Sequence, residues 1–127
     1  MIPTDDSSPH AGSLLDMKQF KAMSDGLGED LGSIISDYFA SCVELTAKLA
    51  EAVRLGDVEK FRDVCHEIKG ASGLLGFRAI AQITADWESS AIEGHIPKDV
   101  ELPKILGDLV IETKTRVNSL TQAETPI

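Results

Sequence analysis

Apolar residues recur at spacings of three and four along most of this chain, which is the period of an amphipathic helix. The longest uninterrupted stripe predicts a helix over about residues 29–55. Its apolar positions are Leu31, Ile35, Tyr38, Cys42, Leu45, Leu49 and Val53. Gly56 then provides a helix end, and Asp57 can cap the helix that follows.

The same spacing predicts three further long helices, over about residues 58–75, 78–93 and 99–120. A shorter helix should begin after Ser13, where an acidic residue three positions later is typical of a capping box, and should end at the stretch SDGLGED. The sequence has no sustained period-two alternation of the kind that strands show. Because the connections are short, successive helices should pack antiparallel. We therefore expect an all-α fold, an antiparallel up-down four-helix bundle with a short additional N-terminal helix across one end.

This bundle should span residues 13–122 as a single domain. Residues 1–12 carry Pro, Ser, Asp and Gly with little that could pack, so we expect a disordered tail there and another over residues 123–127.

Composition narrows the function classes. The chain has 127 residues and a net charge of −9, which argues against nucleic-acid binding and against docking on an anionic membrane. No apolar run approaches the length of about 20 residues that a membrane helix needs. Two cysteines without a CxxC motif, Cys42 and Cys65, indicate neither a disulfide framework nor a zinc site. These features predict a cytoplasmic protein.

One histidine stands on the polar side of a predicted helix. In the segment 58–75 the apolar stripe is centred near Ile68, and a rotation of about 100° per residue turns His66 about 140° away, toward solvent. Gly70 and Gly73 share that side, although each glycine weakens a helix interior by about 1 kcal/mol relative to alanine. Lys69 lies one turn after His66.

These four residues together suit one chemistry. An exposed imidazole is mostly neutral, and so nucleophilic, at neutral pH. Gly70 leaves space beside the ring, Gly73 extends the uncovered surface, and Lys69 can neutralise a negative group attached to the ring. The arrangement predicts that His66 attacks a phosphoryl group presented by another protein.

The segment HEIKGASGLLG, residues 66–76, resembles the signature of histidine-containing phosphotransfer (HPt) domains. In that signature His is followed by an apolar residue, Lys, Gly, a small pair and a further Gly about ten residues on. The resemblance extends to the preceding LGD and DYFASCVELTAKLAEAV, and covers about residues 14–121.

The resemblance implies a phosphocarrier in a two-component phosphorelay, which is not an enzyme with its own kinase activity. Such domains take a phosphoryl group from the aspartate of one receiver domain and pass it to another, in pathways headed by a histidine kinase that can be a hybrid kinase. They need no cofactor of their own, since the receiver supplies Mg²⁺. By this resemblance His66 is the phosphoacceptor and donor, Lys69 its electrostatic support and Gly70 the clearance residue. Family members place further polar groups from the following helix near the phosphate, and Arg78 and Gln82 are the nearest candidates here.

We expect the partner receiver to dock on the surface around His66, with the carrier as a monomer. The predicted docking residues are Glu59, Arg62, Asp63, Gly73, Phe77 and Arg78.

Several alternatives remain open from the sequence. His66 could be an idle surface histidine, Gly73 could allow close helix packing, Gly76 could be only a helix end, and Phe77 could belong to the core. The same bundle could also bind and inhibit a receiver or kinase without transfer, or could be the phosphorylated domain of a chemotaxis-type kinase.

Other motifs are weaker. His66-Glu67 begins a zinc-protease HExxH, but Gly70 occupies the position of the second ligand. GLGEDLG has the wrong spacing for a dinucleotide loop and follows no strand. His10 and His95 lack a following Lys-Gly, and Glu88 and Glu93 do not face each other as an acid/base pair.

Overall fold

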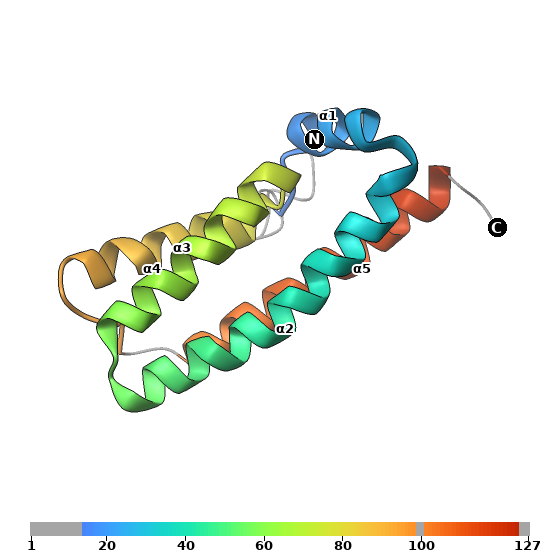
Figure 1. Ribbon diagram of the computed structural model, residues 1–127. Helices are drawn as coiled ribbons and strands as arrows, with labels where there is room; N and C mark the ends of the chain where they lie inside the picture. The colour runs from blue at the N-terminus through green and yellow to red at the C-terminus, as the bar shows by residue number, and fades with distance from the viewer. Residues whose placement is uncertain (1–13, 99–100, 125–127) are drawn as a thin grey trace, which may run out of the picture.

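The computed structural model describes residues 14–98 and 101–124, and within these ranges the chain is helical, with no strand. The long helices are α2 (Leu31–Leu55), α3 (Val58–Leu75), α4 (Arg78–Ile92) and α5 (Leu102–Glu124). They run up and down as a bundle, and the short α1 (Met17–Leu27) lies across one end (Figure 1). The predicted all-α bundle with an extra N-terminal helix is confirmed.

Local signals fix the bounds of α3. The Asp57 carboxylate accepts a hydrogen bond from the backbone N–H of Lys60 at 3.1 Å, so Asp57 caps the helix. Before it, Gly56 ends α2 with φ 68°, and Gly76 ends α3 with φ 83°. Both φ values lie in the left-handed region that glycine adopts without strain. These residues give α3 the same bounds that the sequence predicts.

The structure corrects the predicted course of α1. Its N-cap is Asp16, whose side chain accepts from the backbone N–H of Gln19 at 3.1 Å, so the helix begins three residues later than expected. The helix also continues into the stretch SDGLGED, where the sequence predicts its end, and reaches Leu27. Met23 and Leu27 pack against the core, and this contact outweighs the local turn signal. A 3₁₀ turn, Gly28–Asp30, then joins α1 to α2.

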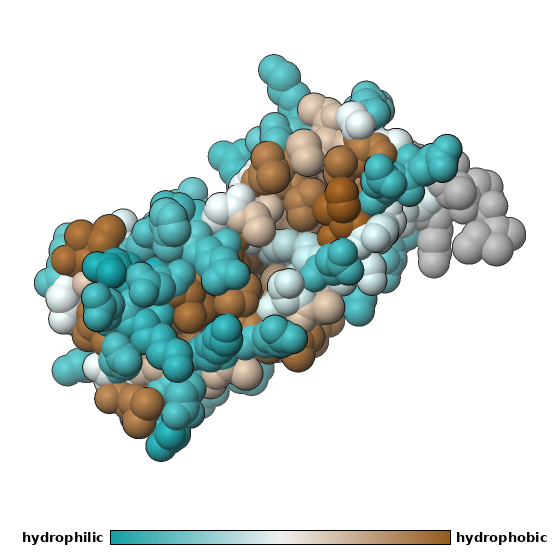
Figure 2. Space-filling model, viewed as in Figure 1, coloured by the Kyte–Doolittle hydropathy of each residue, from teal (hydrophilic) through white to brown (hydrophobic). Residues whose placement is uncertain are grey.

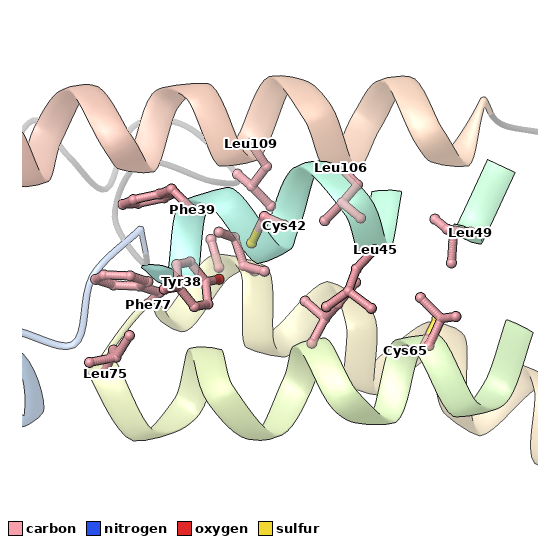
Figure 3. Packing of buried hydrophobic residues seen from close by; sticks show 14 of the residues in the cluster. Tyr38, Phe39, Cys42, Leu45, Leu49, Cys65, Leu75, Phe77, Leu106 and Leu109 are labelled. Carbon is pink, nitrogen blue, oxygen red and sulfur yellow. The ribbon is translucent and has the colours of Figure 1, made fainter. Parts of the chain in front are cut away.

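Leucine, isoleucine and valine fill most of the core (Figure 3). Leu49, Ile68 and Leu106 are almost completely buried, and burial of such a side chain stabilises the fold by about 1.5–3 kcal/mol. Cys42 and Cys65 are buried free thiols. Burial raises the pKa of Cys42, and burial followed by the nearby Glu88 carboxylate raises the pKa of Cys65 to about 12. Both cysteines are therefore core residues in their thiol form.

Phe77 is a core residue, so its prediction as a docking residue is wrong. Its side chain is completely buried. The ring centroid lies 5.0 Å from that of Tyr38, 5.6 Å from that of Phe39 and 6.3 Å from that of Phe20. Because α1 covers the turn between α3 and α4, the aromatic side chain at this turn faces inward rather than toward a partner (Figure 3).

The same turn requires glycine at position 76. The backbone N–H of Asp16 donates to the carbonyl oxygen of Gly76 at 2.8 Å, which holds the start of α1 against the end of α3. A Cβ atom on Gly76 would lie 2.7 Å from the backbone nitrogen of Phe20. Gly76 is thus a helix terminus, one of the alternatives left open by the sequence, and its backbone also lies directly against the backbone of α1.

The predicted tails lie almost entirely outside the described residues. The exception is at the C-terminal end, where α5 continues to Glu124, two residues into the predicted tail.

Candidate functional site

The His66 side chain projects from α3 into solvent, as the helical phase predicts. It is 69% exposed, whereas Cys65 before it and Ile68 two positions later are buried. The helix thus presents the imidazole on the side opposite its apolar stripe.

A carboxylate from α4 holds both polar side chains of this surface. Nδ1 of His66 lies 2.8 Å from Oε2 of Glu88, and Nζ of Lys69 lies 2.7 Å from Oε1 of the same carboxylate. The Glu88 side chain is only 12% exposed. We refer to His66, Glu88 and Lys69 as the His–Glu–Lys triad.

The charges of the triad decide which imidazole nitrogen is free. The Lys69 ammonium, and after it the hydrogen bond from His66, hold the pKa of Glu88 below its ordinary value, against the opposing effect of its burial. Glu88 is therefore ionised at neutral pH, and an ionised carboxylate can only accept hydrogen bonds. Nδ1 of His66 must then donate. In the neutral ring Nε2 carries the lone pair, and within the described residues Nε2 has no hydrogen-bond partner.

Next to the imidazole, α3 presents a bare strip. Gly70 and Gly73 are both exposed, and a Cβ atom built on either would meet nothing within 4 Å. The packing of this chain therefore does not require glycine at these positions, and the alternative in which Gly73 allows close helix packing is wrong. Each glycine nevertheless weakens α3 by about 1 kcal/mol relative to alanine. The strip leaves the surface beside His66 open to an approaching molecule.

Residues 33–123 match the family model described as Hpt domain. The chain belongs to the Hpt domain family. No curated protein and no solved structure matches the chain significantly. Membership agrees with the resemblance carried by HEIKGASGLLG and implies a part in phosphotransfer within two-component relays.

Four charged side chains among the predicted docking residues of this Hpt domain lie at the surface, and Arg62 pairs with two of the others. Arg62 lies 3.2 Å from Asp63 and 3.8 Å from Glu59. All three precede His66 on α3, so they form a charged surface on one side of the ring. Arg78 is exposed at the start of α4. None of the four contributes to the core.

The polar partner that α4 supplies to the site is neither of the two candidates from the sequence. Among the described residues, the side-chain contacts of His66 and Lys69 run to Glu88 and not to Arg78 or Gln82. Gln82 instead donates to Asp86 at 3.2 Å. Glu88 lies at the level of His66, and at a rise of about 1.5 Å per residue Arg78 lies roughly 15 Å and Gln82 roughly 9 Å from that level along α4.

An apolar groove lies between α1, α2 and α3. Its volume is about 390 Å³ and its lining includes Met23, Ile34, Glu67, Ala71 and Leu74. Glu67 adjoins His66 in the chain and Ala71 adjoins Gly70, so the groove borders the site. Figure 2 shows an apolar surface where the end of α3 meets α1 and the first part of α2.

Sequence reasoning missed Glu88. From the sequence, Glu88 enters only as a possible acid/base partner of Glu93 on the same helix. The signal that could have found it is the hairpin itself: His66 is ten residues before Gly76, and Glu88 is eleven after Phe77. In an antiparallel pair joined by a turn this short, such positions lie at the same level.

Two further observations concern other classes of site. Within residues 14–98 and 101–124, no cluster of three or more His, Cys, Asp or Glu side chains could hold a metal ion. None of the helices in this part of the chain combines the length and the apolar character that crossing a membrane requires.

Proposed function

We propose that this chain is a phosphocarrier in which Nε2 of His66 accepts a phosphoryl group from the aspartyl phosphate of a receiver domain and passes it to a second receiver. One observation carries this proposal. Glu88 binds Nδ1 of an exposed histidine and so leaves the unprotonated Nε2 beside an open strip of α3.

The transfer needs only groups that the site and the receiver hold. The Nε2 lone pair attacks phosphorus, the N–P bond forms and the P–O bond to the receiver aspartate breaks, with its electron pair remaining on that carboxylate. The ring becomes positively charged and keeps its proton on Nδ1, where the ionised Glu88 stabilises it. The reverse sequence of bond changes delivers the phosphoryl group to the next receiver.

Each side of His66 offers a different contact to the receiver. Toward α1, the apolar groove that includes Ile34 and Leu74 can receive an apolar surface; these side chains are 37% and 58% exposed. Toward the start of α3, the charges of Glu59, Arg62 and Asp63 can favour or reject a partner by complementarity. In this proposal the receiver also contributes the Mg²⁺ that transfer requires.

The test is incubation with a panel of receiver domains carrying a radiolabelled aspartyl phosphate. We expect the chain to gain label that is acid-labile and alkali-stable, as phosphohistidine is, and to lose it to a second receiver. His66→Gln should gain none. His95→Gln, which replaces an exposed histidine outside the site, is the matched control and should gain label like the parent.

If the chain binds a receiver but no receiver in the panel transfers label to it, the carrier proposal fails and the interaction module without transfer takes its place. Equal labelling of His66→Gln and the parent would place the phosphoryl group on another residue.

A further inference from the structure

We propose that Lys69 changes partner when His66 is phosphorylated, leaving the Glu88 carboxylate for the phosphoryl oxygens while the charged imidazole takes its place as the counterion of Glu88. This lysine exchange rests on the proposed function in one respect, that His66 is the phosphorylated residue.

The exposures of the triad favour movement of the lysine rather than of the carboxylate. Glu88 is 12% exposed and both of its oxygens are bound, whereas the Lys69 side chain is 37% exposed. Lys69 also has the longer and more flexible side chain. Its ammonium contacts the carboxylate that contacts the imidazole, so it is one group away from the reacting ring.

The charges before and after transfer match this exchange. The ring that attacks must be neutral, and in that state the Glu88 carboxylate has Lys69 as its only cationic contact among the described residues. Attack by Nε2 places a positive charge on the ring, with the Nδ1–H still directed at Oε2 of Glu88. The carboxylate then has a second cation, and Lys69 is released for the phosphoryl group. The Glu88 carboxylate and the phosphoryl group then each have a cationic partner.

The surroundings offer few other cations for that group. Arg62, one turn before His66, is already bound to Asp63 and Glu59. Glu67 and Asp63 add negative charge on the same exposed helix. A phosphoryl group carries about two negative charges at neutral pH, and in this acidic setting it requires a nearby cation.

The experiment uses the intact chain, phosphorylated on histidine with phosphoramidate, a small phosphoryl donor that transfers its group with release of ammonia. No receiver is involved. The ¹⁵Nζ resonance of Lys69, observed through its Cε protons, is compared with and without phosphorylation in the parent, Glu88→Gln and Asp86→Asn. Glu88→Gln keeps an oxygen that can accept from Nδ1 but removes the charge. Asp86→Asn removes an exposed carboxylate of the same helix that binds Gln82, and serves as the control.

We expect the Lys69 resonances of the parent and Glu88→Gln to differ before phosphorylation and to coincide after it. Asp86→Asn should follow the parent in both states. A Lys69 resonance that still distinguishes the parent from Glu88→Gln after phosphorylation would overturn the exchange, since the lysine would then have remained on the carboxylate. Failure of phosphoramidate to modify His66 would overturn it as well. If the exchange is seen but no receiver transfers label to the chain, the exchange stands and only the relay function fails.

Discussion

Glu88 of α4 accepts a hydrogen bond from Nδ1 of His66 on α3 at 2.8 Å, so one helix determines which nitrogen of the other helix's histidine is free. The contact is made by a carboxylate that is largely buried and that Lys69 keeps ionised. A substitution of Glu88 that removes the acceptor oxygen and one that keeps it should therefore differ in their effect on the rate of phosphoryl transfer.

Glu88→Ala should lower the rate of phosphoryl acceptance. It removes the acceptor of a hydrogen bond to a ring that becomes charged, and such bonds contribute about 1.5–3 kcal/mol, or roughly tenfold to a hundredfold in rate. Glu88→Gln keeps an acceptor oxygen and should lose less. The measurement is the initial rate of label transfer from a receiver, with Asp86→Asn as the control. Equal rates for Glu88→Ala and the parent would mean that the tautomer is not set by this contact.

Substitutions at Gly70 should affect the free energy of unfolding and the rate of phosphoryl transfer independently. Because a Cβ atom there meets nothing within 4 Å, Gly70→Ala should raise the free energy of unfolding by about 0.8–1.0 kcal/mol. Gly70→Glu should also keep the fold but slow transfer by roughly tenfold or more, since it places bulk and negative charge where the receiver lands. Chemical denaturation and transfer rates test the two effects. Unchanged transfer by Gly70→Glu would remove the clearance role.

At Gly76, which ends the same helix, an added Cβ atom has no room, in contrast to Gly70. Gly76→Ala places a Cβ atom 2.7 Å from backbone nitrogen of Phe20 at a residue with φ 83°. We expect a loss of about 2 kcal/mol or more in unfolding free energy, because both the left-handed conformation and the backbone contact are unfavourable for alanine. A melting temperature equal to that of the parent would show that α1 does not pack against this turn as described.

The lowered pKa of Glu88 predicts a pH dependence of stability. A carboxyl whose pKa is lower in the folded state stabilises the fold above its unfolded value, near 4.5, and this contribution disappears as the pH falls through the folded value. The parent should therefore be more stable than Glu88→Gln at neutral pH, and the difference should shrink below about pH 4.5. Denaturation of both proteins across this range is the measurement. A difference that stays constant with pH would contradict the ionised state of Glu88.

The fold was largely predictable because its signals are local. Asp57 and Gly76 mark the ends of α3 within a few residues, and the apolar stripe around Ile68 is enough to place His66 on the exposed side. Each of these inferences needs only the helical period and the preferences of capping residues.

The features that the sequence did not predict depend on how the helices pack against one another. Glu88 becomes a partner of His66 only through the level at which α4 passes α3. Phe77 is buried because α1 covers the turn that carries it. The course of α1 past its predicted end depends on the contacts of Met23 and Leu27 with the core. These are tertiary relationships, which local propensity does not contain.

The most direct test of the account is to identify the ring nitrogen that receives the phosphoryl group. The chain, labelled with ¹⁵N in its histidines, is phosphorylated by a receiver that transfers to it, and the ³¹P–¹⁵N coupling of the product is measured by NMR. We predict coupling to Nε2 of His66, because Nδ1 is bound to Glu88. Coupling to Nδ1, or phosphorus on any other residue, would contradict the account.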